Sequence, residues 1–284
     1  MSHTLILVTG AQGQLGQSLQ WIHKFAPQNN DLVLLGRDEL DITQTDSISH
    51  ALDKYKPAVL INAAAYTAVD KAESEPDLAH LINGVAPGLL AIACAQRAIK
   101  MVHVSTDYVF DGLASQPYSE EASTGPVSIY GQSKLEGEQA VLNALPSAII
   151  LRTSWVFSQF GNNFLKTMLR LGCERTELSI VVDQIGGPSY APHIAQVLLS
   201  LAAQQTKPTH GQGEHSAPSG IYHFAGQPYT SWYDFAHEIF KQATKLGLLA
   251  QPPALHAIPS SQYPTPATRP AQSSLEQGKL NALL

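Results

Sequence analysis

A short apolar segment followed at once by three regularly spaced glycines constrains the fold of this chain more than any other feature. Residues 4–9 (TLILVT) have the composition of a buried strand, and Gly10, Gly13 and Gly16 lead from it into helical periodicity over residues 14–25. In such a strand–turn–helix unit, one glycine permits the tight turn, one lets the backbone approach a pyrophosphate, and one permits close packing of helix on strand. The spacing is GxxGxxG rather than GxGxxG, so the motif by itself also fits glycines in an ordinary tight turn.

The alternation of strand and helix continues through the first half of the chain. Further strands are predicted at residues 31–35, 58–62, 100–105 and 148–152. Helices are predicted at residues 42–55, at 76–97 with a perturbation at Pro87 and Gly88, and around Tyr130. This order predicts an α/β fold, a Rossmann-type doubly wound parallel sheet covered by helices on both faces. We therefore predict a dinucleotide-binding Rossmann domain over residues 1–152.

Beyond residue 152 the pattern is less regular. Residues 153–284 are predicted to form mainly a smaller C-terminal substrate-binding region, interwoven with the last elements of the first domain. Its predicted elements are helices at residues 164–171, 194–203 and 232–245 and a strand at 221–224. A surface loop is predicted at residues 206–220, and the proline-rich residues 252–270 are predicted to run extended over the surface.

Composition excludes several classes of protein. With 284 residues and 44% hydrophobic content, the chain can bury a large core. Its net charge is −6 and it has no basic run, so neither a nucleic-acid partner nor a membrane-surface partner is predicted. A strand begins within three residues of the N-terminus and no apolar stretch approaches the ~18 residues of a membrane span, so we expect a cytoplasmic protein.

The cysteines and histidines do not indicate a metal site. Cys94 and Cys173 lie far apart without CxxC spacing, so both are expected to be reduced thiols in the core. The eleven histidines are scattered, and His210, His215 and His223 are expected to be solvated near the predicted surface loop. We predict no metal ion, and no acidic cluster near the first helix suggests Mg²⁺.

Tyr130 and Lys134 are the residues best suited to chemistry on a carbonyl or an alcohol. Four residues apart on a predicted helix, they share one face. A free phenol ionises near pH ~10, so it needs help to transfer a proton at neutral pH. A nearby ammonium stabilises the phenolate, and the hydroxyl of Thr106 can hydrogen-bond the phenolic oxygen. These three residues are therefore the predicted proton-transfer site.

Residues that follow the second and third predicted strands are expected to contact a dinucleotide, because the carboxyl edge of the sheet is where it should lie. Arg37 can accommodate the 2′-phosphate of NADPH, whereas an acidic residue at this place binds the ribose of NADH. Asp38 stands beside Arg37, so NADPH is favoured and NADH remains plausible. Further cofactor contacts are predicted at Asp41, Ile42, Ala63, Ala64 and Ala65.

Several longer motifs carry a resemblance that runs almost from end to end. They are TGAQGQLG (9–16), GRDELDIT (36–43), NAAAYTAVDKAE (62–73), STDYVFDG (105–112), YGQSKLEGE (130–138), RTSWVF (152–157), VVDQIGGPS (181–189) and RPAQSSL (269–275). Together they resemble the extended short-chain dehydrogenase/reductase superfamily and, within it, the family of dTDP-4-dehydrorhamnose reductases. The resemblance implies NAD(P)H-dependent reduction of the C4 keto group of dTDP-4-dehydro-β-L-rhamnose, a step of dTDP-L-rhamnose and cell-surface polysaccharide synthesis. Ser189 and His193 depart from the Thr and Asp that this family often carries.

The resemblance also implies roles for individual residues. Tyr130 would donate the proton, Lys134 would bind the nicotinamide ribose and lower the pKa of that tyrosine, and Thr106 would orient the phenol. Asp107, Trp155 and Arg269 would join Thr106 in binding the dTDP-sugar. The residues lining the cofactor would be Gly10, Gly13, Gln14, Leu15, Gly16, Arg37, Asp41, Ile42, Ala63, Ala64, Ala65, Tyr130 and Lys134. A homodimer is compatible with the family.

Two other functions stay open at this stage. One is a catalytically silent regulatory relative that binds the cofactor and a partner protein, against which the complete set of Thr106, Tyr130 and Lys134 argues. The other is a reductase or epimerase of another nucleotide-linked 4-keto-6-deoxy sugar. An epimerase or dehydratase that retains NAD⁺ would call for an acidic residue directly after the second strand, and Gly36-Arg37 does not supply one.

Overall fold

A six-stranded parallel sheet forms the centre of the protein. The computed structural model describes residues 4–25, 30–207 and 217–284. The strand order is β10-β5-β4-β3-β1-β2, and every pair in it is parallel. The bounds are β1 (Thr4–Thr9), β2 (Asn30–Leu35), β3 (Val59–Asn62), β4 (Lys100–Thr106), β5 (Ile149–Thr153) and β10 (Gly220–Phe224). The predicted doubly wound α/β fold is confirmed, and the order reverses between β1 and β3, where such sheets bind ligands.

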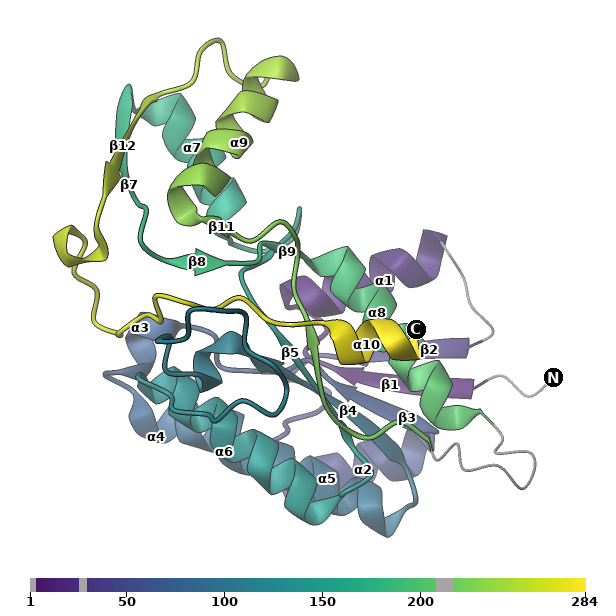
Figure 1. Ribbon diagram of the computed structural model, residues 1–284. Coiled ribbons are helices and arrows are strands. Elements are labelled where there is room, and N and C mark those ends of the chain that lie inside the picture. The colour runs from purple at the N-terminus through teal and green to yellow at the C-terminus, as the bar shows by residue number, and fades with distance from the viewer. Residues whose placement is uncertain (1–3, 26–29, 208–216) are drawn as a thin grey trace.

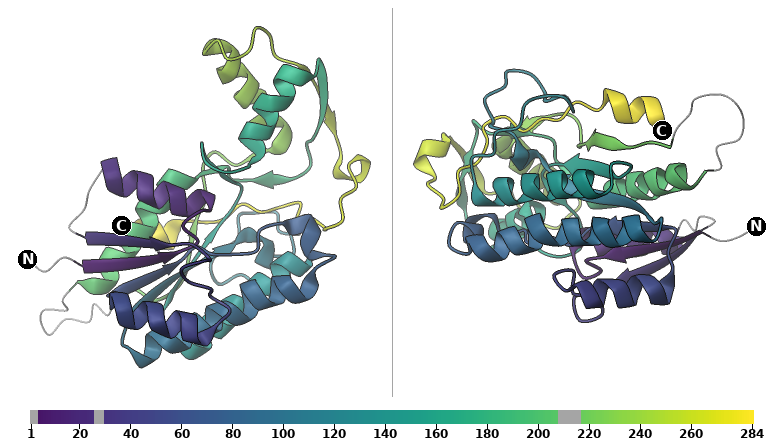
Figure 2. Two further views of the ribbon diagram at one scale, coloured as in Figure 1. Left: turned by 180° about the vertical axis from the view of Figure 1, so that it is seen from behind. Right: turned by 90° about the horizontal axis from the view of Figure 1, so that it is seen from below.

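Helices cover both faces of this sheet (Figures 1 and 2). One face packs on α1 (Gln14–Phe25) and α8 (Ala191–Thr206), and the other on α2 (Thr45–Tyr55), α5 (Ala86–Gln96) and α6 (Ile129–Ala144). Successive strand residues point to opposite faces, so Ile6 and Val8 join the first layer while Leu7 joins the second. Both layers are buried, as expected for a parallel sheet.

The predicted helix at residues 76–97 is divided into three parts. It consists of α4 (Pro76–Ala79), a π-helical segment (His80–Val85) and α5. The perturbation lies one turn before Pro87, because this proline has no N–H to donate to the preceding turn. The expectation that no apolar stretch approaches the length of a membrane span is wrong for residues 76–96, which are long and apolar enough by composition. The most apolar window of this stretch is 56% buried inside the protein, as in a core helix.

A smaller region lies above the carboxyl edge of the sheet (Figure 1). There α7 (Phe164–Glu174) and α9 (Trp232–Lys245) pack on the parallel pair β7 (Glu177–Val181) and β12 (Ala254–Ile258). Short pairs join the region to the sheet domain: β6 (Val156–Phe157) with β9 (Ser189–Tyr190), and β8 (Ile185–Gly186) with β11 (Thr230–Ser231).

The chain crosses between the two regions more than once. After residue 152 it returns to the sheet domain to form α8 and β10. The C-terminal segment, yellow in Figure 1, then runs between the regions and ends in α10 (Gly278–Leu283) beside β10. Three short helices complete the fold: α3 (Val69–Ala72) and the 3-10 turns Asp107–Val109 and Ser260–Gln262.

Two predictions about individual residues are wrong. Cys173 is exposed on α7, whereas Cys94 is buried in α5, where burial raises the pKa of its thiol to about 12. His223 is fully buried in β10 rather than solvated. Residues 252–270 are mostly exposed or half-buried, and the strand β12 lies within them, in agreement with the predicted extended course over the surface. His210 and His215 lie outside the described residues, as does most of the predicted loop at residues 206–220.

Candidate active site

A cavity of about 820 Å³ lies at the carboxyl edge of the sheet, where β1, β3 and β4 end. It extends from the glycine turn to the first residues of the smaller region. Most residues predicted to bind cofactor or substrate line it: Gly10, Gly13, Gln14, Leu15, Arg37, Asp41, Ile42, Ala63, Ala64, Ala65, Thr106, Asp107, Tyr130, Lys134 and Trp155. Gly16 and Arg269 do not. Most of the predicted site residues therefore line one cavity, although the strands that carry them are distant in the chain.

The glycine turn has the close approaches that its sequence requires. Gly10 has a φ of +75°, and a Cβ there would lie 2.8 Å from the backbone of Ala63. At Gly16 a Cβ would lie 2.3 Å from the Gly10 carbonyl oxygen, so this glycine packs α1 against the turn instead of facing the cavity. Gly13 lines the cavity, and a Cβ there would meet only the Gly10 oxygen, at 3.4 Å. The turn thus leaves an open backbone cradle of the kind that a pyrophosphate occupies.

Gln14 connects this turn to a loop that the sequence did not single out. Its Oε1 accepts hydrogen bonds from Ser158 Oγ (3.1 Å) and Asn163 Nδ2 (2.9 Å). The Asn163 side chain also caps α7, accepting from the backbone N–H of Lys166 at 3.1 Å. Gly161, from the same loop, lines the cavity. The two regions of the fold are therefore held together at the site expected for the cofactor phosphates.

Arg37 and Asp41 lie where the second strand leads into the cavity. Arg37 is exposed and lines the cavity. Asp41 Oδ1 accepts hydrogen bonds from the hydroxyl and the backbone N–H of Thr43, and these bonds, helped by the charge of Arg37, lower the pKa of Asp41. The carboxylate of Asp41 is thus already hydrogen-bonded within its own loop, whereas the guanidinium of Arg37 is available to an anionic ligand.

Tyr130 lies in the first turn of α6, buried at the cavity wall. Ser128 caps this helix by accepting from the backbone N–H of Gly131 at 3.2 Å. Burial raises the pKa of Tyr130 to about 12, although a hydrogen bond with Thr106 opposes this increase. The sequence predicted a lowered pKa, so burial outweighs the expected stabilisation of the phenolate. A phenol with a raised pKa keeps its proton at neutral pH and can act as an acid.

Lys134 is one turn further along α6 and is only 2% exposed. Its Nζ donates a hydrogen bond to the backbone carbonyl of Val104 at 2.7 Å, at the end of β4. Burial lowers the pKa of Lys134 to about 8, while the charge of Glu138 acts to raise it. Lys134 therefore contacts both the sheet and the cavity.

Asp107 places a buried carboxyl group in the cavity wall. Its side chain is 2% exposed, Oδ1 accepts from the hydroxyl of Thr106 at 2.9 Å, and Oδ2 has no hydrogen-bond partner in the described part of the chain. Burial raises the pKa of Asp107 to about 7. A buried carboxyl oxygen without a partner at a cavity wall is suited to a ligand hydroxyl.

Trp155 is held in place by residues that the sequence did not connect with it. Its ring stacks on Trp232 of α9 with centroids 3.5 Å apart and an interplanar angle of 4°. Its Nε1 donates to Ser273 Oγ at 3.1 Å. The φ of Trp155 is +46°, a conformation that large residues rarely adopt and that tends to persist where the surroundings fix it. Ser273 lies within the RPAQSSL motif, which was the only signal for it in the sequence.

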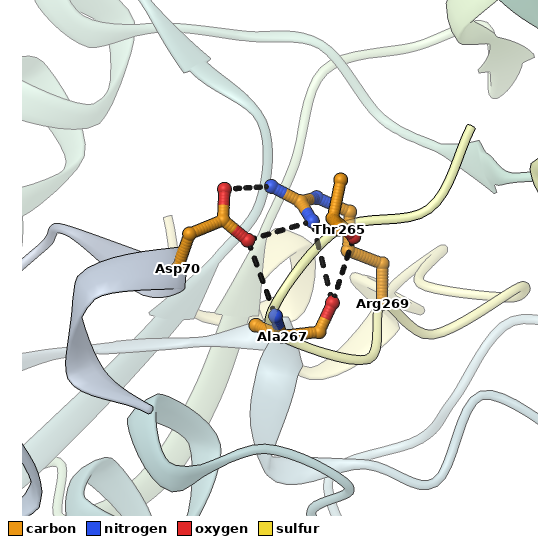
Figure 3. Close-up of polar contacts among 4 residues, drawn as sticks. All are labelled: Asp70, Thr265, Ala267 and Arg269. Atoms are coloured by element: carbon orange, nitrogen blue, oxygen red, sulfur yellow. Dashed lines mark hydrogen bonds and ion pairs between the residues drawn. The ribbon is translucent and has the colours of Figure 1, made fainter. Parts of the chain in front are cut away.

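Arg269 lies on the C-terminal segment and binds Asp70 of α3 instead of lining the cavity (Figure 3). Its Nη1 and Nη2 donate to the two oxygens of Asp70 at 3.0 and 2.7 Å. Asp70 also accepts from the backbone N–H of Ala267 at 3.3 Å, and Thr265 donates to the Ala267 carbonyl. The pair thus fastens the C-terminal segment to the sheet domain next to the cavity. Among the described residues, no group of three or more His, Cys, Asp or Glu side chains could hold a metal ion.

The fold and the site together define a class of protein. A doubly wound sheet with a glycine cradle at its switch point, and a buried Thr–Tyr–Lys set facing the same cavity, are typical of Rossmann-type nicotinamide-dependent oxidoreductases.

Comparison with known proteins gives the family. The model of the RmlD substrate binding domain matches residues 4–284, and the chain belongs to this family. A dTDP-4-dehydrorhamnose reductase of Aggregatibacter actinomycetemcomitans is 47% identical over 97% of this chain and 91% of its own length. A probable dTDP-4,6-dihydroxy-2-methyloxan-3-one 4-ketoreductase of Streptomyces antibioticus is 38% identical over 95% and 85%. The crystal structure of the Bacillus anthracis dTDP-4-dehydrorhamnose reductase in complex with NADP is 34% identical in sequence and has a TM-score of 0.88. The structural match covers 99% of this chain and 93% of that one.

Proposed function

We propose that this protein catalyses the NAD(P)H-dependent reduction of the C4 keto group of dTDP-4-dehydro-β-L-rhamnose, giving dTDP-L-rhamnose. The observation that carries the proposal is the convergence of Thr106, Tyr130 and Lys134 on the cavity that also contains the glycine cradle. The near full-length similarity to reductases of this name supports the choice of substrate.

The residues of the cavity fit a nicotinamide dinucleotide. Gly10 and Gly13 leave the backbone open to a pyrophosphate, and Arg37 supplies a cation for a 2′-phosphate, which favours NADPH over NADH. Lys134 would donate a hydrogen bond to the nicotinamide ribose. When bound, the reduced nicotinamide supplies a hydride for the C4 carbon of the sugar.

Tyr130 supplies the proton that completes the reduction. Its O–H bond breaks as the C4 oxygen gains the proton, and the carbonyl becomes an alcohol. The hydrogen bond with Thr106 orients the phenol and eases loss of the proton, because it lowers the pKa against the effect of burial. Trp155 and Asp107 would hold the nucleotide-sugar, the first by packing and the second through its unpartnered oxygen. Arg269 would act on the substrate indirectly, through the segment that carries Ser273.

The test follows absorbance of NADPH, and separately of NADH, with dTDP-4-dehydro-β-L-rhamnose generated from its precursor in situ. Wild-type protein should oxidise the cofactor only when the sugar is present. Tyr130→Phe should lower the rate by about 10²–10⁴-fold while cofactor binding persists. Turnover that survives this substitution would disprove the assignment of Tyr130 as the acid.

The main alternative is another nucleotide-linked 4-keto-6-deoxy sugar, which the similarity to the Streptomyces antibioticus 4-ketoreductase favours. A panel of such sugars distinguishes the two, because the best substrate should show the highest kcat/KM. A protein that binds NADPH but reduces none of them would instead be a regulatory relative.

We also propose a cytoplasmic homodimer without nucleic-acid or membrane partners. The exposed side chains of Val85 and Ile92 lie seven residues apart, at the end of the π-helical segment and on α5, and offer apolar surface for packing against a second copy. Light scattering of the purified protein measures the mass directly. A monomer at all concentrations would contradict this assembly.

A further inference from the structure

A column of three side chains runs along the buried face of α6. Tyr130, Lys134 and Glu138 are spaced four residues apart, so they lie one above another on the helix. Tyr130 and Lys134 line the cavity, whereas Glu138 lies one turn deeper and does not. Lys134 and Glu138 are both 2% exposed. A buried carboxylate thus lies one helical turn beyond Lys134 on the same face of α6.

Arg152 of β5 fixes the position of this carboxylate. Its Nε and Nη2 donate to Glu138 Oε1 and Oε2 at 2.9 and 2.7 Å, a bidentate pair that is fully buried. The guanidinium lies over the ring of Phe110, 5.0 Å from its centroid. Its Nη1 has no hydrogen-bond partner in the described part of the chain, so Glu138 is the group that compensates this buried charge.

Helix α6 is also held close to its neighbour at the level of this column. A Cβ added at Gly137 would lie 2.0 Å from the Asn83 carbonyl oxygen of the π-helical segment. Asn83 in turn donates to Ser133 Oγ at 3.1 Å. The close contact therefore limits any sliding or rotation of α6 that would move Lys134 away from Val104.

We propose that Glu138, fixed by Arg152, is a positioning residue that keeps Lys134 charged and in place beside Tyr130. The role rests on the proposed function, because it acts through the residue that would bind the cofactor ribose. Glu138 itself touches neither substrate nor cofactor.

The charges around Lys134 support this role. The other ionisable groups that face the column come from β4, the turn at residues 107–109 and β5: His103, Asp107, Tyr108 and Arg152. His103 stays neutral because burial lowers its pKa, so it adds no charge. The ionisable groups of α3, α4 and the π-helical segment are exposed or half-buried: Asp70, Lys71, Asp77 and His80. Helix α5 carries the buried Cys94, whose thiol stays neutral because burial raises its pKa to about 12. Glu138 is thus the carboxylate that opposes the loss of the Lys134 proton on burial.

The direct test measures the charge of Lys134 itself. In cofactor-free protein labelled with ¹³C-lysine, the Lys134 signal is assigned by its loss in Lys134→Met and followed against pH. In Glu138→Gln its titration midpoint should fall by about one pH unit. NADPH affinity, measured by fluorescence, should then weaken at a lower pH than in the wild type. An unchanged midpoint overturns the proposal.

Glu138→Gln leaves Arg152 without a counter-charge and is expected to destabilise the fold, so a second variant is needed. Glu138→Leu/Arg152→Met removes both charges, and apolar replacements of a buried pair are often tolerated. The proposal predicts a downward shift of the midpoint in this variant too, smaller than in Glu138→Gln because the positive charge of Arg152 is also removed, whereas a purely structural pair predicts the wild-type midpoint. Val141→Ala, one turn further on the buried face of α6, is the matched control and should lower stability without moving the midpoint. Because the titration needs no substrate, its result can be interpreted even if the reductase assay fails.

Discussion

Asp107→Asn should change how the stability of the protein depends on pH. The wild-type carboxyl is buried, and its Oδ2 has no hydrogen-bond partner in the described residues, so ionisation inside the protein is unfavourable. Its pKa is raised from 3.8 to about 7, mainly by burial, while the hydrogen bond from Thr106 acts in the opposite direction. Asparagine has nearly the same shape but cannot titrate.

The difference between the pKa of Asp107 in the folded and the unfolded state sets the sign and the size of its effect on stability. Between pH 3.8 and about pH 7 the unfolded carboxyl is ionised while the folded one keeps its proton, so the folded state binds more protons and stability falls as pH rises. Over the whole interval Asp107 should remove about 4 kcal/mol from the free energy of unfolding. Below the interval this contribution is absent, and above it the loss is complete.

Urea unfolding at several pH values between 4 and 8 measures the effect in both proteins. The free energy of unfolding of Asp107→Asn, minus that of the wild type, should rise by about 4 kcal/mol from the acid to the neutral end. Any fixed cost of the new amide cancels in this comparison, because it does not vary with pH. Asp111→Asn is a matched control of opposite sign, since hydrogen bonds from Leu113 and Tyr118 lower the pKa of Asp111. Parallel pH curves for wild type and Asp107→Asn would refute the reasoning.

Two further substitutions test the packing around the site. Gly137→Ala should destabilise the protein by about 3 kcal/mol, because the new Cβ would overlap the Asn83 carbonyl oxygen. Gln139→Ala, at an exposed position of the same helix, is the control and should have little effect. The midpoints of urea unfolding measure both changes. Arg269→Leu removes a partly exposed ion pair with Asp70, worth about 1 kcal/mol, and should raise the sugar KM about fivefold with kcat nearly unchanged. An unchanged KM would mean that the C-terminal segment stays in place without this pair.

The sequence predicted the elements whose signals are local. The bounds of β1, α1 and α9 agree with the structure, because apolar periodicity and an adjacent turn or cap mark each of them. Most residues predicted to bind cofactor or substrate also line the cavity, because the carboxyl ends of parallel strands meet at one edge of the sheet.

What the sequence could not predict depends on contacts between distant segments. Trp155 meets Trp232 and Ser273 only through the folded smaller region, and no pattern near Trp155 indicates either partner. His223 lies near a predicted loop in the sequence, yet its strand is completed by pairing with β5, which buries it. The raised pKa of Tyr130 likewise arises from burial by the assembled fold rather than from its neighbours in the chain.

Buried polar side chains form rows across the sheet beneath the cavity. On the face covered by α5 and α6, Thr9, Asn62 and His103 are neighbours across β1, β3 and β4. Thr9 donates to Asn62 Oδ1 at 2.6 Å, and Asn62 Nδ2 lies 3.0 Å from His103 Nδ1. An amide nitrogen can only donate, so Nδ1 accepts and the proton of the neutral imidazole is on Nε2.

A second row lies two residues further along the strands, on the same face, and crosses β4, β5 and β10. Arg152 is paired there with Ser105 on one side and with His223 on the other. Burial, reinforced by the charge of Arg152, lowers the pKa of His223 to about 3, so this imidazole is neutral at pH 7. His103 of the first row and His223 of the second are therefore both uncharged, and the charged pair here is Arg152 of β5 with Glu138 of α6. The neutral histidines add no repulsion to the ammonium of Lys134, and the positive charge of Arg152 is compensated by its ion pair with Glu138.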